Sequence, residues 1–134
     1  MSGESPSHVR LVERLIALVR RRHQPPRGLL LLADHSDFGS DRPQSIGGFL
    51  PDLFASDLPV TFEVVGEAKT FPDLETDRSV RQIGAFLDHL ALRSGSAFYL
   101  TVPPFTAVRA RTIVRGLLRP CHSAIRIEVH DGLD

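Results

Sequence analysis

Residues 59–70 carry the clearest pattern in the sequence, a two-residue alternation of side-chain character. An extended strand produces such an alternation, because its successive side chains point to opposite faces. One face carries Val60, Phe62, Val64, Gly66 and Ala68, and the other carries Thr61, Glu63, Val65, Glu67 and Lys69. The segment is therefore predicted to be a strand with one apolar face and one largely polar face.

Helical and strand patterns alternate along the rest of the chain. Helices are predicted over residues 8–23, 76–93 and 103–118, and further strands over residues 29–33, 49–55, 96–102 and 124–129. Residues 34–48 are predicted to be a loop and residues 71–75 a turn. Ser7 is the expected N-cap of the first helix, and Thr76 or Asp77 that of the second. The order αβββαβαβ, without a repeat or linker, predicts one α/β domain over residues 1–134.

The composition excludes several classes of protein. A hydrophobic fraction of 42% and a charged fraction of 24% are globular values, which argues against a disordered or fibrous chain. The longest apolar run, Leu29–Ala33, is far too short for a membrane span, and residues 1–8 show no secretory signal. Cys121, the single cysteine, allows no internal disulfide and no multi-cysteine zinc site. A reducing, cytoplasmic location is therefore expected.

The charges balance overall but are unevenly spread. Sixteen basic and sixteen acidic residues cancel, which excludes a uniformly basic surface for nucleic acid but leaves local patches open. Two groups of arginines fit phosphate contacts, and they fit a solvated helix face equally well. They are Arg10, Arg14 and Arg21 on the first helix and Arg109, Arg111 and Arg115 on the last. Lys69 is the only lysine, a hint that its position requires an ammonium group.

Three short segments carry the candidate chemistry: Pro51-Asp52, Glu67-Ala68-Lys69 and Gln82. Glu67 and Lys69 are two residues apart on the predicted strand, so both side chains leave the same face. Asp52 lies on the preceding strand and reaches that face if the two strands pair as a hairpin. Two converging carboxylates make an oxygen-rich site, which suits Mg²⁺ or, as a substitute, Mn²⁺.

The residues around these carboxylates suggest phosphodiester hydrolysis. The carbonyl of Ala68 could add a metal ligand, and the metal would polarise a phosphodiester and lower the pKa of its bound water. Lys69 could orient the attacking water or offset the charge that grows on the phosphate. Gln82 could hydrogen-bond that water or the phosphate, and Glu13, from the first helix, could hold a metal-bound water.

In this order the segments resemble the PD-(D/E)xK nuclease superfamily, the fold of many restriction endonucleases and Holliday-junction resolvases. The matching stretches are residues 46–53 (IGGFLPDL), 64–70 (VVGEAKT) and 79–83 (SVRQI). The resemblance implies a restriction-endonuclease-like αβββαβ core over roughly residues 8–102, with the last helix and strand added to it.

The resemblance also implies roles for individual residues. Asp52 and Glu67 match the metal-holding carboxylates of the family, and Lys69 matches its catalytic lysine. Gln82 matches a helix glutamine of the resolvase-like branch, and Glu13 loosely matches an acidic residue of the first helix. The implied protein is an Mg²⁺-dependent DNA endonuclease that acts on DNA as a homodimer with two active sites.

Two other functions remain open at this stage. In one, the same fold is a non-catalytic binding or assembly subunit. In the other, the chain is an unrelated small α/β interaction domain. Asp52 then caps a turn, Glu67 and Lys69 form a weak surface pair, and Gln82 is an ordinary helix residue. Cys121 and His122 offer only two neighbouring metal ligands, which do not make a site.

Overall fold

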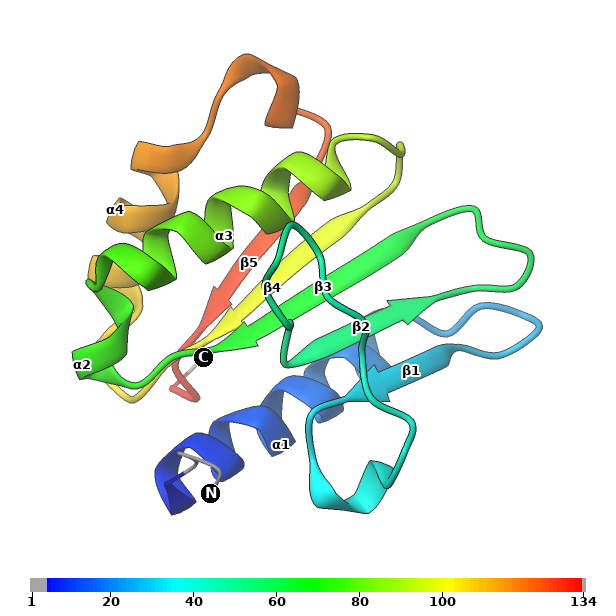
Figure 1. Cartoon of the computed structure of the whole chain (residues 1–134), viewed down its shortest axis with the longest axis horizontal. Helices are drawn as coiled ribbons and strands as arrows, with labels where there is room; N and C mark the ends of the chain where they lie inside the picture. The colour runs from blue at the N-terminus through cyan, green and yellow to red at the C-terminus, as the bar shows by residue number, and fades with distance from the viewer. Residues whose placement is uncertain (1–4, 134) are drawn as a thin grey trace.

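A five-stranded mixed sheet forms the middle layer of the molecule (Figure 1). The computed structural model describes residues 5–133; residues 1–4 and 134, which the predicted domain includes, lie outside the described residues. The helices are α1 (Pro6–Arg22), α2 (Phe71–Leu74), α3 (Asp77–Leu90) and α4 (Ala107–Leu117). The strands are β1 (Leu30–Ala33), β2 (Leu53–Ser56), β3 (Glu63–Ala68), β4 (Ala97–Thr101) and β5 (Arg126–His130). The fold is thus mixed α/β, in the predicted order αβββαβαβ with α2 added before α3.

The strands follow one another across the sheet in the order β1-β2-β3-β4-β5. β1, β2 and β3 pair antiparallel, whereas β3, β4 and β5 pair parallel. Leu53 lies opposite Gly66 in the β2–β3 pair, so the next positions outward, Asp52 and Glu67, come opposite each other. The hairpin that the sequence analysis required is therefore present.

Helices cover both faces of the sheet, with α1 on one side and α3 and α4 on the other (Figure 1). Val64 and Ala68 of β3 belong to the core beneath α1, and Val65 belongs to the core beneath α3. The prediction of a largely polar face on this strand was wrong, because β3 is a central strand covered on both sides. Glu67 consequently has only 2% of its surface exposed.

Two predicted strands are shorter than their sequence patterns. The strand expected at 59–70 spans only Glu63–Ala68. Before it, the Asp57 carboxylate accepts hydrogen bonds from the N–H groups of Thr61 (2.7 Å) and Phe62 (3.2 Å), which fold residues 57–62 into a turn. The strand expected at 49–55 begins at Leu53. Residues 46–49 instead close a tight turn, in which Gly47 and Gly48 adopt φ values of 60° and 85° that glycine readily takes.

The remaining strands and the loop differ little from their predictions. The strands expected at 29–33, 96–102 and 124–129 are Leu30–Ala33, Ala97–Thr101 and Arg126–His130. The predicted loop at 34–48 contains one turn of 3₁₀ helix, Ser36–Phe38.

Helix ends also differ from the predictions. α1 is capped by Ser5 rather than Ser7: the Ser5 hydroxyl accepts from the His8 N–H at 3.2 Å, and Pro6 takes the first helical position, which suits proline. Thr76 caps α3 as predicted, accepting from the Ser79 N–H at 3.1 Å, but the helix ends at Leu90 rather than 93.

The structure departs further from the predicted boundaries at α4 and at the segment before α3. α4 begins at Ala107 rather than 103, because residues 103–106 form a turn closed by a hydrogen bond from the Thr106 N–H to the Pro103 carbonyl. The predicted turn at 71–75 is the short helix α2.

Within residues 5–133, no helix has both the length and the apolar character needed to cross a membrane.

Candidate active site at the carboxyl edge of the sheet

Asp52 lies against the end of β3 because of the β2–β3 pairing. Pro51 and Asp52 come directly before β2, at the edge of the sheet where β3 ends. One carboxylate oxygen of Asp52, Oδ2, accepts a hydrogen bond from the Ala68 N–H at 2.9 Å. The backbone of β3 thus fixes the Asp52 carboxylate beside the Glu67-Ala68-Lys69 segment, and only 8% of the Asp52 surface is exposed.

The carboxyl group of Glu67 is buried, an environment that disfavours its ionised form. Its Oε1 atom is buried and has no hydrogen-bond partner among the described residues. Burial, and next the neighbouring charge of Asp52, raise the pKa of Glu67 well above its usual range, while the Lys69 ammonium opposes this effect. An ionised carboxylate here would be stabilised by an additional positive charge.

The pKa of Asp52 moves in the opposite direction. Burial alone would raise it, but hydrogen bonds from His8, Glu67 and the Ala68 N–H outweigh burial and leave the pKa of Asp52 below its ordinary value. The two carboxyl groups therefore differ in proton affinity, and Glu67 retains a proton to higher pH than Asp52 does. Such a pair of carboxyls with divergent pKa values is typical of functional sites.

Lys69 and Gln82 complete the cluster. The Lys69 ammonium donates a hydrogen bond to Oε1 of Gln82 at 2.5 Å and lies 3.8 Å from Oε2 of Glu67. Both side chains are largely buried, with 9% of Lys69 and 7% of Gln82 exposed. Gln82 reaches the site from the second turn of α3, so three separate elements contribute to one cluster of predicted residues.

The donor set fits a hard divalent cation. Asp52 and Glu67 offer carboxylate oxygens, the ligands that Mg²⁺ and Mn²⁺ prefer, and Glu67 Oε1 lacks any described partner. If both carboxylates ionise, the Lys69 ammonium balances only one of the two negative charges. The contact that Ala68 makes here is through its N–H; its carbonyl as a metal ligand stays a prediction.

His8 is a neighbour of the site that the sequence analysis did not identify. Its Nε2 atom lies 3.5 Å from Oδ2 of Asp52. His8 stands one helical turn before Val12 and two before Leu15, on the stripe of α1 that faces the sheet. The signal that could have revealed it is a histidine at helical spacing from this buried stripe.

Glu13 lies in a second, separate pair. Its Oε2 atom lies 3.0 Å from Nε2 of His35, while Nδ1 of His35 accepts from the Asp37 N–H, so Nε2 carries the proton and donates to Glu13. In the described part of the chain, no hydrogen bond or ion pair joins Glu13 to the Asp52–Lys69 cluster. The His35 loop adjoins that cluster through its neighbour, because the Asp34 N–H donates to the Asp52 carbonyl at 2.9 Å.

A further group of possible metal ligands, Asp88, Cys121 and His122, has its ligand atoms within 4.8 Å of one another. His122 is committed elsewhere, however. Its Nδ1 accepts from the Arg119 N–H at 3.1 Å, so Nε2 carries the proton and donates to Asp88 at 2.8 Å. A metal on Nε2 would have to displace this proton. We therefore interpret the group as a structural connection between α3 and the turn at 120–122.

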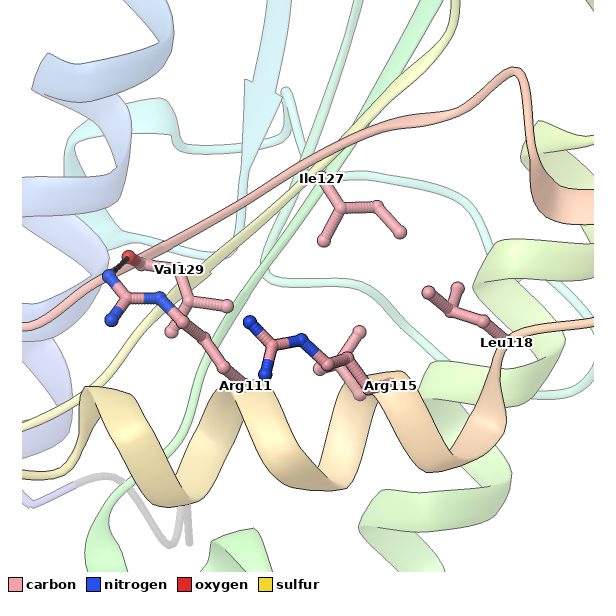
Figure 2. A pocket seen from close by; sticks show the side chains of 6 residues that line it. Arg111, Arg115, Leu118, Ile127 and Val129 are labelled. Carbon is pink, nitrogen blue, oxygen red and sulfur yellow. Dashed lines mark hydrogen bonds between the residues drawn. The ribbon is translucent and has the colours of Figure 1, made fainter.

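The three arginines predicted on the last helix do not form one continuous phosphate-binding surface, because their side chains have different partners. Arg109 forms two hydrogen bonds with the Glu75 carboxylate, at 2.9 and 2.8 Å. Arg111 and Arg115 extend from α4 toward β5 over the apolar side chains of Ile127 and Val129, in a pocket of about 320 Å³ (Figure 2). Arg111 donates to the Val129 carbonyl at 3.1 Å. This pocket lies between α4 and β5, and none of the predicted catalytic residues lines it.

Comparison with known proteins adds no assignment. No family model, no curated protein and no solved structure matches this chain. The candidate site therefore rests on its own geometry and chemistry.

Proposed function

We propose that this protein is a metal-dependent phosphodiester hydrolase that acts on DNA, built on a restriction-endonuclease-like core of the PD-(D/E)xK type. One observation carries the proposal. Asp52, Glu67, Lys69 and Gln82, which are distant in sequence, converge at one edge of the sheet, and the buried Glu67 carboxyl there has an oxygen without a described partner.

Each side chain has a definite task in this proposal. Asp52 and Glu67 would hold Mg²⁺ or Mn²⁺, which when bound polarises the phosphodiester and makes a water molecule more acidic. Lys69 places a buried positive charge beside Glu67, where it can orient the attacking water and offset the charge that grows on the phosphate oxygens. Gln82 fixes the direction of the Lys69 ammonium through its carbonyl oxygen.

The proposal extends to partners. All four side chains come from one chain, so each protomer of the predicted homodimer would carry a complete site. The homodimer, the cytoplasmic location and the contribution of Glu13 stay predictions. If the protein instead serves as a non-catalytic binding subunit, DNA would bind to it without being cut.

A cleavage assay tests the proposal. Supercoiled plasmid and a synthetic four-way junction are incubated with the full chain in Mg²⁺, Mn²⁺ or EDTA, beside Lys69→Ala and a control, Arg119→Ala. Arg119 is an exposed basic residue that pairs with Asp88, away from the site. Cutting that needs the metal, is lost in Lys69→Ala and persists in Arg119→Ala is expected. Undiminished cutting by Lys69→Ala, or no cutting by the parent chain, contradicts the proposal.

A further inference from the structure

A groove runs along α1 beside the candidate site. Arg10, Arg14, Ala17 and Arg21 are spaced by four, three and four residues, so they form one stripe on this helix. A pocket of about 530 Å³ is lined by Arg10 and Arg14, and one of about 270 Å³ by Arg14, Ala17 and Arg21. Because both pockets share Arg14, we treat them as one feature, the α1 groove.

The α1 groove lies at the carboxyl ends of the parallel strands. Thr70, Pro103 and Thr101 are among the residues that line it, and they come at or after the ends of β3 and β4. Ligands of open α/β sheets commonly bind at this edge. Thr70 directly follows Lys69 in the chain, so the groove and the proposed catalytic cluster share this edge of the sheet, although none of the four cluster residues lines the groove.

Positive charge in the α1 groove is not neutralised by the described residues. Arg10 donates to the Ser7 hydroxyl at 3.5 Å and Arg14 to the Val102 carbonyl at 3.3 Å. Within residues 5–133, neither of them nor Arg21 forms an ion pair. Other arginines do pair with carboxylates: Arg22 and Arg126 with Glu128, Arg42 with Asp34, Arg109 with Glu75 and Arg119 with Asp88. The stripe is therefore available for an anionic chain.

The length of the stripe suits a short run of nucleotides. Arg10 and Arg21 are eleven residues apart, which corresponds to about 16 Å along a helix that rises 1.5 Å per residue. At about 3.4 Å per stacked nucleotide, this distance covers about five nucleotides of one strand.

Two exposed aromatic side chains stand at the end of the groove nearest Lys69. Phe71, which lines the groove, is 57% exposed, and Phe105, which directly follows the groove residue Pro104, is 88% exposed. Phe105 also has φ 66°, in the turn closed by Thr106 and Pro103, at a position that favours glycine. Phe105 is thus an exposed phenylalanine in an unfavourable backbone conformation, and such positions cluster at functional sites.

Together these features point to one kind of ligand. Arginines along a groove with exposed aromatic rings bind single-stranded nucleic acid, because the rings stack on bases that are not paired. In a duplex the faces of the bases are already stacked on one another.

We propose that the α1 groove binds a single-stranded stretch of DNA, with phosphates on Arg10, Arg14 and Arg21 and unpaired bases on Phe71 and Phe105. The consequence for the substrate rests on the proposed nuclease function. If the protein is a nuclease, binding in the α1 groove makes its preferred substrate a DNA with an unpaired strand, such as a free single strand or a flap.

Binding in EDTA tests the groove without catalysis. Fluorescence anisotropy compares a labelled 20-nucleotide single strand with a blunt duplex of the same sequence. The single strand is expected to bind at least about tenfold more tightly. The double variant Phe71→Ala/Phe105→Ala should raise the single-strand Kd at least about tenfold and leave the duplex Kd unchanged. Phe71→Tyr/Phe105→Tyr should keep the parent affinity, because the rings remain.

Arginine variants give the second arm of the test. Arg10→Ala/Arg21→Ala should weaken binding and reduce its salt dependence, since two phosphate contacts are removed. Arg126→Ala, at the amino end of β5 and paired with Glu128, is the matched control and should change nothing. Thermal melts confirm that each variant is folded. Equal affinity for single strand and duplex, or no effect of the phenylalanine variants, overturns the proposal.

Cleavage of the same DNAs in Mg²⁺ separates this inference from the proposed function. If the parent chain cuts DNA but the phenylalanine variants cut single strand and duplex in the parent ratio, the groove assignment is wrong and the nuclease remains. If the parent chain cuts nothing, yet binds single strands in a way that depends on Phe71, Phe105 and the arginines, the nuclease is wrong and the groove remains.

Discussion

Two clusters of polar side chains in this fold differ in character. The Asp88 cluster consists of Asp88, Arg119, Cys121 and His122, and the Glu67 cluster consists of Asp52, Glu67, Lys69 and Gln82. Asp88 is about half exposed, and hydrogen bonds from His122 and Arg119 lower its pKa. Glu67 is buried, its pKa is raised, and one of its oxygens has no described partner. In the Asp88 cluster, the Asp88 carboxylate accepts hydrogen bonds from Arg119 and His122, and the second ring nitrogen of His122 accepts from the Arg119 N–H. The Glu67 cluster keeps an unfavourable arrangement that a bound cation would relieve.

The comparison shows that proximity alone does not define a metal site. Asp88, Cys121 and His122 meet a geometric criterion for metal ligands, yet the proton on His122 is already shared with Asp88. Asp52 and Glu67 are two neighbouring acidic groups, with the Lys69 ammonium beside Glu67 and His8 beside Asp52. Where the protons lie and which atoms lack partners distinguish the two clusters better than distances between residues.

The largest expected difference between the clusters concerns catalysis. Removing the Lys69 ammonium should reduce the rate of metal-dependent DNA cleavage at least about 100-fold, because charge stabilisation in a buried site contributes that much. Asp88→Asn should leave the rate within about twofold of the parent, since its cluster takes no part in the proposed reaction. Initial rates on the same DNA measure both. Comparable losses in the two variants would remove the distinction.

Metal binding should also separate the clusters. Mg²⁺ at about 100 times its Kd is expected to stabilise the folded chain by about 2.7 kcal/mol, which raises the melting temperature relative to EDTA. This shift should vanish in Asp52→Asn and persist in Cys121→Ser. A shift that depends on Cys121 instead would identify the Asp88 cluster as the metal site.

The stability of the metal-free chain gives a third test. Folded Glu67 retains its proton above the ordinary pKa of 4.5, whereas the unfolded chain releases it, so the free energy of unfolding should fall as pH rises above that value. Glu67→Gln should remove this decline, so that in EDTA the variant gains stability relative to the parent chain between pH 5 and pH 8. Urea unfolding at pH 5 and pH 8 measures the effect. A variant that gains no stability relative to the parent between these pH values would show that the carboxyl is well accommodated.

Asp88 should show a smaller effect of opposite sign. Its pKa is lowered, chiefly by the hydrogen bond from His122, so its stabilising contribution is present above the ordinary value of 3.8 and is lost as pH falls through the lower folded pKa. Asp88→Asn should cost about 0.5–1 kcal/mol at pH 7, because water can partly replace the exposed carboxylate. The difference from the parent should shrink in acid unfolding experiments near pH 3. A difference that is constant over this range would assign the loss to packing.

The sequence predicted much of the geometry of the candidate site, because its residues follow simple local rules. The spacing of Glu67 and Lys69 placed both on one strand face, and Asp52 reached that face through the hairpin. The spacing of Val80, Ile83 and Leu87 indicated the helix that carries Gln82. His8 escaped this reasoning, because a histidine on a buried helical stripe is usually a packed side chain, and only the position of α1 over the sheet brings it to Asp52.

The sequence by itself determined the order of the strands and of the three long helices, and it identified four residues that converge, because periodicity and turn residues act over short distances. The tertiary structure alone decided that both faces of β3 are covered, that Glu67 is therefore buried, and that Glu13 pairs with His35. It also decided which arginines lack an ion pair within residues 5–133, since ion pairs such as Arg109 with Glu75 join residues far apart in the chain. Burial and partnership depend on which elements pack together, and that information is spread over the whole chain.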